Sequence, residues 1–226
     1  LGYRSTPNTY DAWNVTQYEQ YIRDLLVFGA NSIELIPALK PDAPRTAIMP
    51  LSPWEMNVRL SRLLDEYDLD VWVWLPNTDV PSGQPADIAR MVADRRRIFE
   101  SMPRLDHVFV PGGDPGDMPL EELFALLERM AEELHRVHPH VGLWLSPQGF
   151  SRERMDAFYR FLRERQPDWL TGVVYGPWIR DRMERVREMV PARYKLRRYP
   201  DITHCVRCQY PVPEWDMAFA LTLNRE

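Results

Sequence analysis

Short apolar runs alternate with longer amphipathic stretches along most of this chain. Each run is rich in valine, isoleucine, leucine, tryptophan or tyrosine, and ends at a proline, a glycine or a polar cluster. The six runs are Ser32–Pro37, Leu69–Pro76, His107–Pro111, Val141–Pro147, Leu170–Pro177 and Arg193–Tyr199. Apolar runs of this length are typical of parallel strands that are covered on both faces.

The stretches between the runs have the apolar spacing of amphipathic helices. Four of them are Gln17–Phe28, Leu120–Val137, Met155–Leu162 and Met183–Val190. Helix starts are marked by residues that cap free backbone N–H groups. These signals are Asn14 with Gln17, Ser52 with Pro53 and Glu55, Pro119 with Glu121 and Glu122, and Ser151 with Glu153.

Strands that recur roughly every 30 to 35 residues, each followed by a helix, predict right-handed parallel β/α units. We therefore expect an α/β fold of the TIM-type (β/α)8 barrel class, in a single domain over residues 1–226. A short strand at Leu1–Arg4 brings the count to about seven, so we expect an excerpt of a longer chain in which the barrel is truncated. The pattern of Trp215–Leu223 favours a helix, and the alternative is that Met217–Leu223 is the eighth strand.

Composition excludes several classes of partner. The formal charge of −5 gives no general attraction for a phosphate backbone, so nucleic acid is not an expected partner. No run reaches the roughly 18 to 20 apolar residues of a membrane helix. The first residues lack the pattern of a signal peptide, and neither compartment nor oligomeric state can be read from the sequence. Cys205 and Cys208 lack further zinc ligands nearby, so we expect no metal and no cofactor.

Polar and aromatic residues follow the predicted strands, and in a barrel these strand ends converge on one mouth. Carboxylates, amides, arginine and flat aromatic rings together are typical of sugar sites, because aromatic faces pack on C–H surfaces while polar groups bind hydroxyls. The predicted substrate-binding residues are Arg4, Glu34, Asp79, Trp144, Gln148, Tyr175 and His204. Glu34 alternates with Ile33 and Leu35, so its side chain points opposite to theirs, and pairing with Arg4 is the simpler interpretation of its charge.

Two aspartates are the candidate catalytic residues. Asp114 follows Gly112-Gly113 directly after an apolar strand, and Asp201 follows the last apolar run. Carboxylates from these two strands face each other across a barrel, as an acid and a nucleophile do in glycoside cleavage. Asp114 equally suits a turn or a helix cap, and Asp201 suits an Asx turn after proline.

The Gly112-Gly113-Asp114 segment resembles the Gly-Gly-Asp-Glu motif of β-N-acetylhexosaminidases, in which Asp orients the substrate acetamide and Glu is the general acid. Pro115 stands here in place of that acid. Arg4 matches the sugar-binding arginine at the end of the first strand in those enzymes. Leu170–Pro177 and Tyr199–His204 are similar to bacterial proteins grouped near the hexosaminidase and α-glucuronidase barrels. The resemblance implies a sugar substrate.

These features predict a glycoside hydrolase-like catalytic barrel that acts on a glycan through Asp114 and Asp201. Arg4, Trp144, Tyr175 and His204 hold the sugar in this hypothesis. A non-catalytic carbohydrate-binding barrel is the alternative, since Pro115 removes the usual acid. A third hypothesis is another barrel enzyme, such as a metal-dependent hydrolase or an isomerase.

Overall fold

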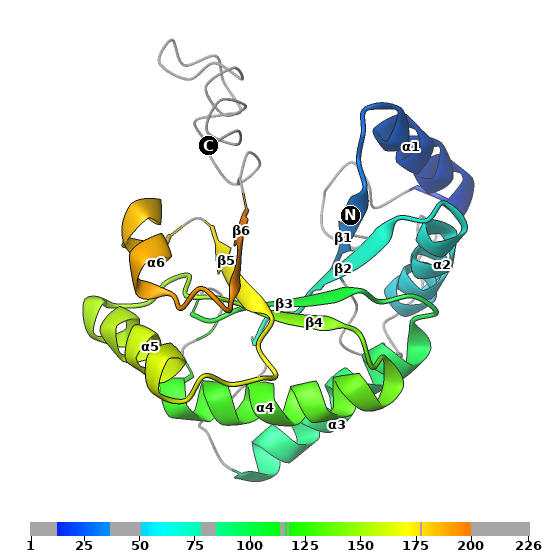
Figure 1. Ribbon diagram of the computed structural model, residues 1–226. Coiled ribbons are helices and arrows are strands. Elements are labelled where there is room, and N and C mark those ends of the chain that lie inside the picture. The colour runs from blue at the N-terminus through cyan, green and yellow to red at the C-terminus, as the bar shows by residue number, and fades with distance from the viewer. Residues whose placement is uncertain are drawn as a thin grey trace.

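The computed structural model describes residues 13–36, 51–77, 85–113, 116, 118–176 and 178–199. Within these ranges, helices and strands alternate regularly along the chain (Figure 1). The helices are α1 (Val15–Val27), α2 (Pro53–Glu66), α3 (Pro85–Ser101), α4 (Leu120–Val137), α5 (Arg152–Glu164) and α6 (Met183–Met189). The strands are β1 (Ser32–Leu35), β2 (Asp70–Trp74), β3 (His107–Pro111), β4 (Gly142–Ser146), β5 (Gly172–Tyr175) and β6 (Lys195–Arg198).

All six strands lie in one parallel sheet, in the order β1-β2-β3-β4-β5-β6. The helices form an arc around one side of this sheet and leave its other face concave (Figure 1). The six predicted strands and the alternating α/β architecture are confirmed as a half-barrel. Leu1–Arg4 and Met217–Leu223 lie outside the described residues, so a seventh strand and a closed TIM barrel remain predictions.

Local signals explain where the helices begin. Asn14 and Ser52 both form complete capping boxes, in which the side chain three residues later bonds back to the cap backbone. The Ser151 side chain accepts a hydrogen bond from the N–H of Arg154, whereas Pro119 contributes no side-chain cap. The predicted helix starts are therefore confirmed, and α3 is the described helix that the sequence pattern did not predict.

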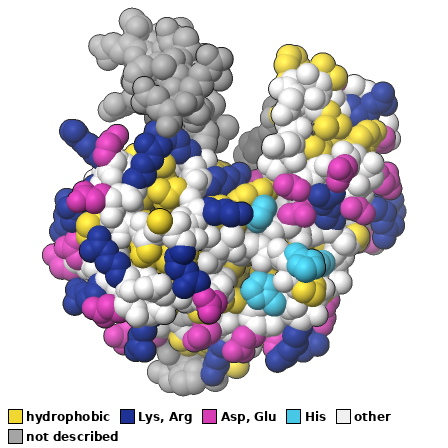
Figure 2. Space-filling view, viewed as in Figure 1, with side chains coloured by type: hydrophobic (Ala, Val, Ile, Leu, Met, Phe, Trp, Pro, Cys, Tyr) yellow, Lys and Arg dark blue, Asp and Glu magenta, His cyan; other side chains and the backbone are white. Residues whose placement is uncertain are grey.

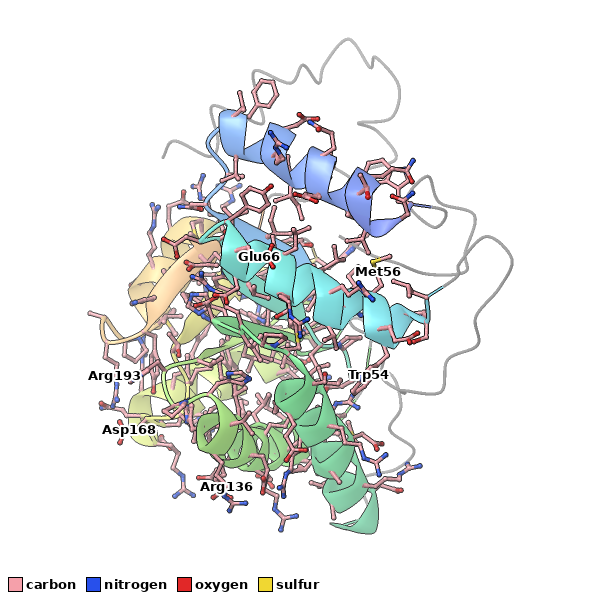
Figure 3. The ribbon with its side chains drawn as sticks, turned by 90° about the vertical axis from the view of Figure 1, so that its right-hand side faces the viewer. Trp54, Met56, Glu66, Arg136, Asp168 and Arg193 are labelled. Atoms are coloured by element: carbon pink, nitrogen blue, oxygen red, sulfur yellow. The ribbon has the colours of Figure 1, made fainter. Side chains whose placement is uncertain are left out.

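The main core lies between the sheet and the helices. Side chains alternate between the two faces of a strand, so Val71 and Val73 of β2 point to the helix layer and are fully buried. Leu60 and Leu64 of α2 are buried in the same core. On that flank α1 packs beside α2, and Met56 of α2 is almost fully buried (Figure 3).

Ion pairs tie together the loops that precede the strands. Arg104 bonds to Asp70 at the start of β2 (3.0 Å) and to Asp106 just before β3 (2.9 Å). Arg193 and Asp168 form an ion pair between the segments that lead into β6 and β5 (Figure 3). In barrels this end of the sheet serves stability, which leaves the opposite end for the site.

Candidate functional site

The concave face of the sheet carries a layer of large rings. Trp72 of β2 lies 4.1 Å from the ring of His107 and 5.2 Å from the ring of Trp144, measured between centroids. The indole N–H of Trp144 donates to Nδ1 of His107 at 3.1 Å, so the proton of the neutral imidazole lies on Nε2. Burial lowers the pKa of His107, which favours this neutral form.

Two glycines make room for the indole of Trp144. A Cβ on Gly142 would lie 2.6 Å from Nδ1 of His107, and a Cβ on Gly172 would overlap the Trp144 ring itself. The ring can therefore lie across the sheet between neighbouring strands. Trp144, a predicted substrate-binding residue, is only 5% exposed, because most of its ring is buried against the other rings of the layer.

Glu34 lies on the same concave face, near the end of β1. The phenol of Tyr199 donates to its Oε1 at 3.1 Å, and a guanidinium nitrogen of Arg197 lies 3.6 Å from its Oε2. Burial raises the pKa of Glu34, although Arg197 and the hydrogen bond from Tyr199 oppose the shift. Glu34 thus favours its protonated form more than an exposed glutamate does, while its side chain keeps 16% exposure.

Arg197 and Tyr199 come from the opposite edge of the sheet, on and just after β6. The guanidinium of Arg197 lies 3.6 Å above the ring of Trp72, and the ring of Tyr199 lies 5.5 Å from that of Phe109. Burial lowers the pKa of Arg197. Arg4, the predicted partner of Glu34, lies outside the described residues. A partly buried carboxyl with a raised pKa, a phenol and a cation therefore lie together beside aromatic rings.

The loops after β3 and β4 pack closely at the C-terminal edge of the sheet. The N–H of Gly112 donates to the carbonyl of Ser146 at 2.8 Å, and a Cβ at Gly112 would lie 2.8 Å from the Phe150 ring. A Cβ at Gly113 would lie 2.8 Å from the carbonyl oxygen of Gln148. Contact between the two loops therefore accounts for the Gly-Gly pair. Gln148, a predicted substrate-binding residue, is half-buried at this edge.

Buried polar side chains occur at the ends of β2 and β4. Asn77 is 3% exposed and Ser146 is fully buried. Neither side chain has a hydrogen-bond partner among the residues that the structure describes. Buried polar groups are usually hydrogen-bonded, so these two are unusual and can bond to a water or a ligand group.

Tyr175 lies on the other face of the sheet. Its neighbour Val174 belongs to the concave cluster with Trp72 and Trp144, whereas Val173 and Tyr175 pack against the helix-side core. Alternation along β5 therefore separates Tyr175 from the face that holds Glu34. The other predicted site residues lie outside the described residues, namely Arg4, Asp79, Asp114, Asp201 and His204.

The structure thus brings Glu34 and Trp144 to one face and places Gln148 at the edge of that face. The contributions of Arg197, Trp72 and His107 were not predicted from the sequence. Their shared signal is alternation, because each faces opposite to an aliphatic neighbour on its own strand that packs in or against the helix-side core.

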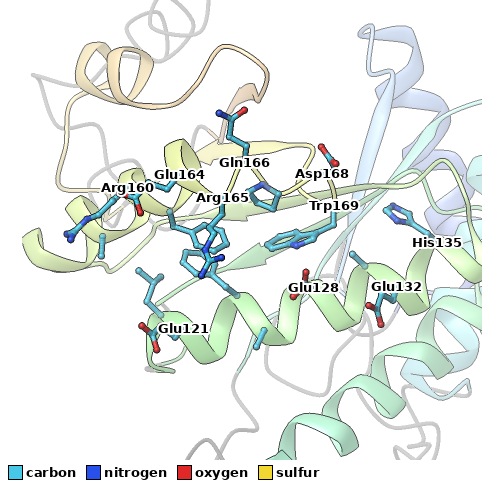
Figure 4. Close-up of a pocket in the computed structure, with 17 residues that line it drawn as sticks. Glu121, Glu128, Glu132, His135, Arg160, Glu164, Arg165, Gln166, Asp168 and Trp169 are labelled. Carbon is cyan, nitrogen blue, oxygen red and sulfur yellow. The ribbon is translucent and has the colours of Figure 1, made fainter.

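A surface groove of about 1100 Å³ lies elsewhere, between α4 and α5 (Figure 4). Trp169, Phe124 and Phe161 contribute apolar surface, and Glu121, Glu128 and Glu132 of α4 contribute carboxylates. The groove is on the helix layer and contains none of the predicted site residues. In the space-filling view, acidic and basic side chains are interspersed over the visible face (Figure 2).

The described ranges contain no group of three or more histidine, cysteine, aspartate or glutamate side chains arranged to hold a metal ion. Cys205 and Cys208 lie outside these ranges. None of the described helices combines the length and apolar character needed to cross a membrane.

No family model and no curated protein matches this sequence. Among solved structures, the chain is similar to the AHE enzyme from Alicyclobacillus herbarius (TM-score 0.44, 10% identity, 71% of this chain and 54% of that one). It is also similar to a glycoside hydrolase family 5 protein from Bacteroides vulgatus (TM-score 0.44, 12% identity, 79% of this chain and 40% of that one). A third similar structure is β-glucuronidase 3 from Bacteroides uniformis (TM-score 0.39, 15% identity, 73% of this chain and 22% of that one).

The chain spans between 22% and 54% of the length of these three structures. Similarity at these TM-scores carries no argument for a family or an activity. The resemblance to the hexosaminidase and α-glucuronidase group remains a prediction. What the described residues establish is a parallel half-barrel whose concave face holds the half-buried carboxyl of Glu34 beside a cation and aromatic rings.

Proposed function

We propose that this chain is a glycoside hydrolase-like barrel domain that cleaves a glycan with carboxyl groups at the C-terminal side of its sheet. The observation that carries the proposal is the environment of Glu34. Its carboxyl has a raised pKa, keeps some exposure, and lies beside Arg197 and Tyr199 among aromatic rings. A general acid in glycoside cleavage needs a raised pKa so that it still holds a proton near neutrality.

Glu34 supplies the acid that Pro115 removes from the Gly-Gly-Asp segment. In the proposed reaction the Glu34 proton passes to the glycosidic oxygen as the bond between that oxygen and the anomeric carbon breaks. A carboxylate, Asp114 or Asp201, stabilises or traps the positive charge on the sugar. Water then adds to the anomeric carbon and returns a proton to the carboxylate of Glu34, so the enzyme is regenerated.

The remaining predicted residues bind the sugar in this proposal. Arg4, Asp79, Gln148 and His204 provide donors and acceptors for hydroxyl groups, and Trp144 supports the floor of the site. Tyr175 does not contact the sugar in this proposal, because it packs on the helix side of the sheet.

The test is a panel of 4-nitrophenyl glycosides that includes N-acetylglucosaminides and glucuronides, assayed with the full chain. We expect turnover by the wild type and a loss of about 10² to 10⁴-fold in kcat/KM for Glu34→Gln, typical of removing a general acid. Asp114→Asn and Asp201→Asn should each lose at least as much. Glu128→Gln, a change on the exposed face of α4, is the control and should keep full activity.

Each outcome bears on the proposal. Retained activity in Glu34→Gln would remove the proposed acid. Sugar binding by calorimetry without turnover would replace the catalytic proposal with the carbohydrate-binding alternative. If no glycoside is bound or cleaved, the proposal is wrong altogether.

A further inference from the structure

Trp178, in the loop after β5, combines exposure with an unusual backbone. Its side chain is 68% exposed. Its φ of 61° lies in the left-handed region, which residues other than glycine rarely adopt. A large apolar side chain that is both exposed and held in a strained conformation is a reason to look for a function.

Two hydrogen bonds hold the loop that contains Trp178 in place. The carbonyl of Trp178 accepts from the N–H of Gly149 at 3.2 Å, and the guanidinium of Arg180 donates to the carbonyl of Phe150 at 3.1 Å. These bonds join the loop after β5 to the loop after β4.

The next residue, Asp181, anchors the loop to α5. It is 4% exposed and accepts hydrogen bonds from Arg152 at 2.8 Å and from Tyr159 at 2.9 Å. Buried charge-assisted bonds of this kind are strong. The indole of Trp178 is therefore presented from a rigid segment.

Trp178 belongs to the rim on the side of the proposed site. Its bonded neighbour Gly149 follows Gln148, and the Gln148 carbonyl in turn packs against Gly113. The loops after β3, β4 and β5 are thus in contact with one another. In the sequence, Asp114 comes next after the described part of the loop that follows β3. Val27 and Phe28, the other exposed large apolar residues of the described ranges, end α1 and have no positive φ.

We infer that Trp178 is a platform on which a sugar ring stacks, and that it forms a second subsite on the rim. The inference rests on the proposed function and adds to it a requirement for an oligosaccharide. Pyranose rings present apolar C–H faces that pack on an indole, and a preorganised platform loses little entropy on binding. Because Glu34 lies on the concave face and Trp178 on the rim, they contact different rings.

The experiment compares chain lengths. Calorimetry and kinetics use 4-nitrophenyl glycosides with one, two and three sugars, from the N-acetylglucosamine, glucuronic acid and glucose series. For the longer substrates we expect Trp178→Asn to raise KM and Kd about ten-fold, or about 1.4 kcal/mol, with kcat nearly unchanged. Asparagine tolerates the left-handed backbone, so this variant removes the ring and keeps the loop. The single-sugar substrate should show no change.

Two further variants separate stacking from folding. Trp178→Phe should keep most of the affinity, because it preserves an aromatic face. Phe28→Ala removes an even more exposed ring from the end of α1 and should change nothing. Equal effects of Trp178→Asn on all chain lengths, or no effect on any, would overturn the subsite while Glu34-dependent turnover still stands. If the wild type neither binds nor cleaves any of these sugars, the proposed function and the subsite are both wrong.

Discussion

Glu34 acquires its acid–base character from residues that are remote in the sequence. Its neighbours along β1, Ile33 and Leu35, are buried in the core on the helix side of the sheet. Tyr199 and Arg197 supply the hydrogen bond and the positive charge, and burial outweighs both of them in setting the direction of the pKa shift. A carboxyl of this kind binds its proton more tightly in the folded chain than in the unfolded chain.

This shift predicts a pH-dependent difference in stability between the wild type and Glu34→Gln. A raised folded-state pKa stabilises the protein below the ordinary pKa of 4.5, and the contribution is lost as pH rises through the folded-state value. The Tm of Glu34→Gln should therefore rise relative to the wild type as the pH is raised above about 4.5. Thermal unfolding followed by circular dichroism measures this difference, with Glu128→Gln as the baseline. Parallel Tm curves for the wild type and Glu34→Gln would contradict the raised pKa.

At the scale of elements, short-range signals decide where helices begin. The capping boxes at Asn14 and Ser52 form between residues three apart, so the sequence contains all of the information they need. Helix α3 was missed for an equally local reason. Arg95 occupies a core position, 1% exposed, and donates to the carbonyl of Pro76 at 3.0 Å. A charge at a core position, followed by two more arginines, breaks the apolar stripe on which the prediction depends.

Packing on the sheet depends on glycines that leave space for large side chains of neighbouring strands, and the sequence alone does not show which glycine does so. Gly172 of β5 provides the space for the Trp144 ring, whereas a Cβ on Gly176, after the same strand, would lie 3.5 Å from the Cβ of Tyr199, in ordinary contact. A Cβ at Gly172 would therefore collide with its neighbour, whereas a Cβ at Gly176 would not.

We predict that Gly172→Ala destabilises the fold by about 1 to 3 kcal/mol, the usual range for overpacking a close-packed site. Gly176→Ala should change stability by much less. Urea unfolding measures both free energies, and near-UV circular dichroism should show the disturbed tryptophan environment in Gly172→Ala alone. Equal stabilities for the two variants would refute the packing role of Gly172.

At the scale of the whole molecule, the half-barrel brings its two edge strands together across the concave face. Glu34 of β1 and Tyr199 after β6 are 165 residues apart in the chain, yet their side chains share a hydrogen bond. Curvature of the sheet, which the helix arc follows, makes this contact possible (Figure 1). The proposed site therefore requires the whole described sheet.

Tyr199→Phe tests this long-range contact. Loss of one hydrogen bond to a buried carboxyl should lower the free energy of unfolding by about 1 kcal/mol. The same change should raise the pKa of Glu34 further, because the Tyr199 hydrogen bond lowers that pKa. Carbon-13 NMR titration of the glutamate carboxyls measures the pKa, and urea unfolding measures the stability.

Tyr67→Phe is the matched control. It removes another phenol–carboxylate hydrogen bond, from Tyr67 to Glu19 at 2.9 Å, between α2 and α1. The Glu34 titration should be the same as in the wild type. A Glu34 titration that is also unchanged in Tyr199→Phe would show that the contact across the sheet does not act on the carboxyl.

The sequence by itself determined the alternation of strands and helices, the parallel α/β class and most helix starts. Those features depend on apolar periodicity and on hydrogen bonds between residues a few positions apart. It also indicated Glu34 as a strand residue that faces away from its aliphatic neighbours. Only the tertiary structure decided that Arg197 and Tyr199 surround this carboxyl, that Tyr175 faces the helices, and that Trp178 stands on a fixed rim. The reason is that these environments come from strands and loops remote in the chain, and the burial that sets a pKa exists only once the sheet has curved.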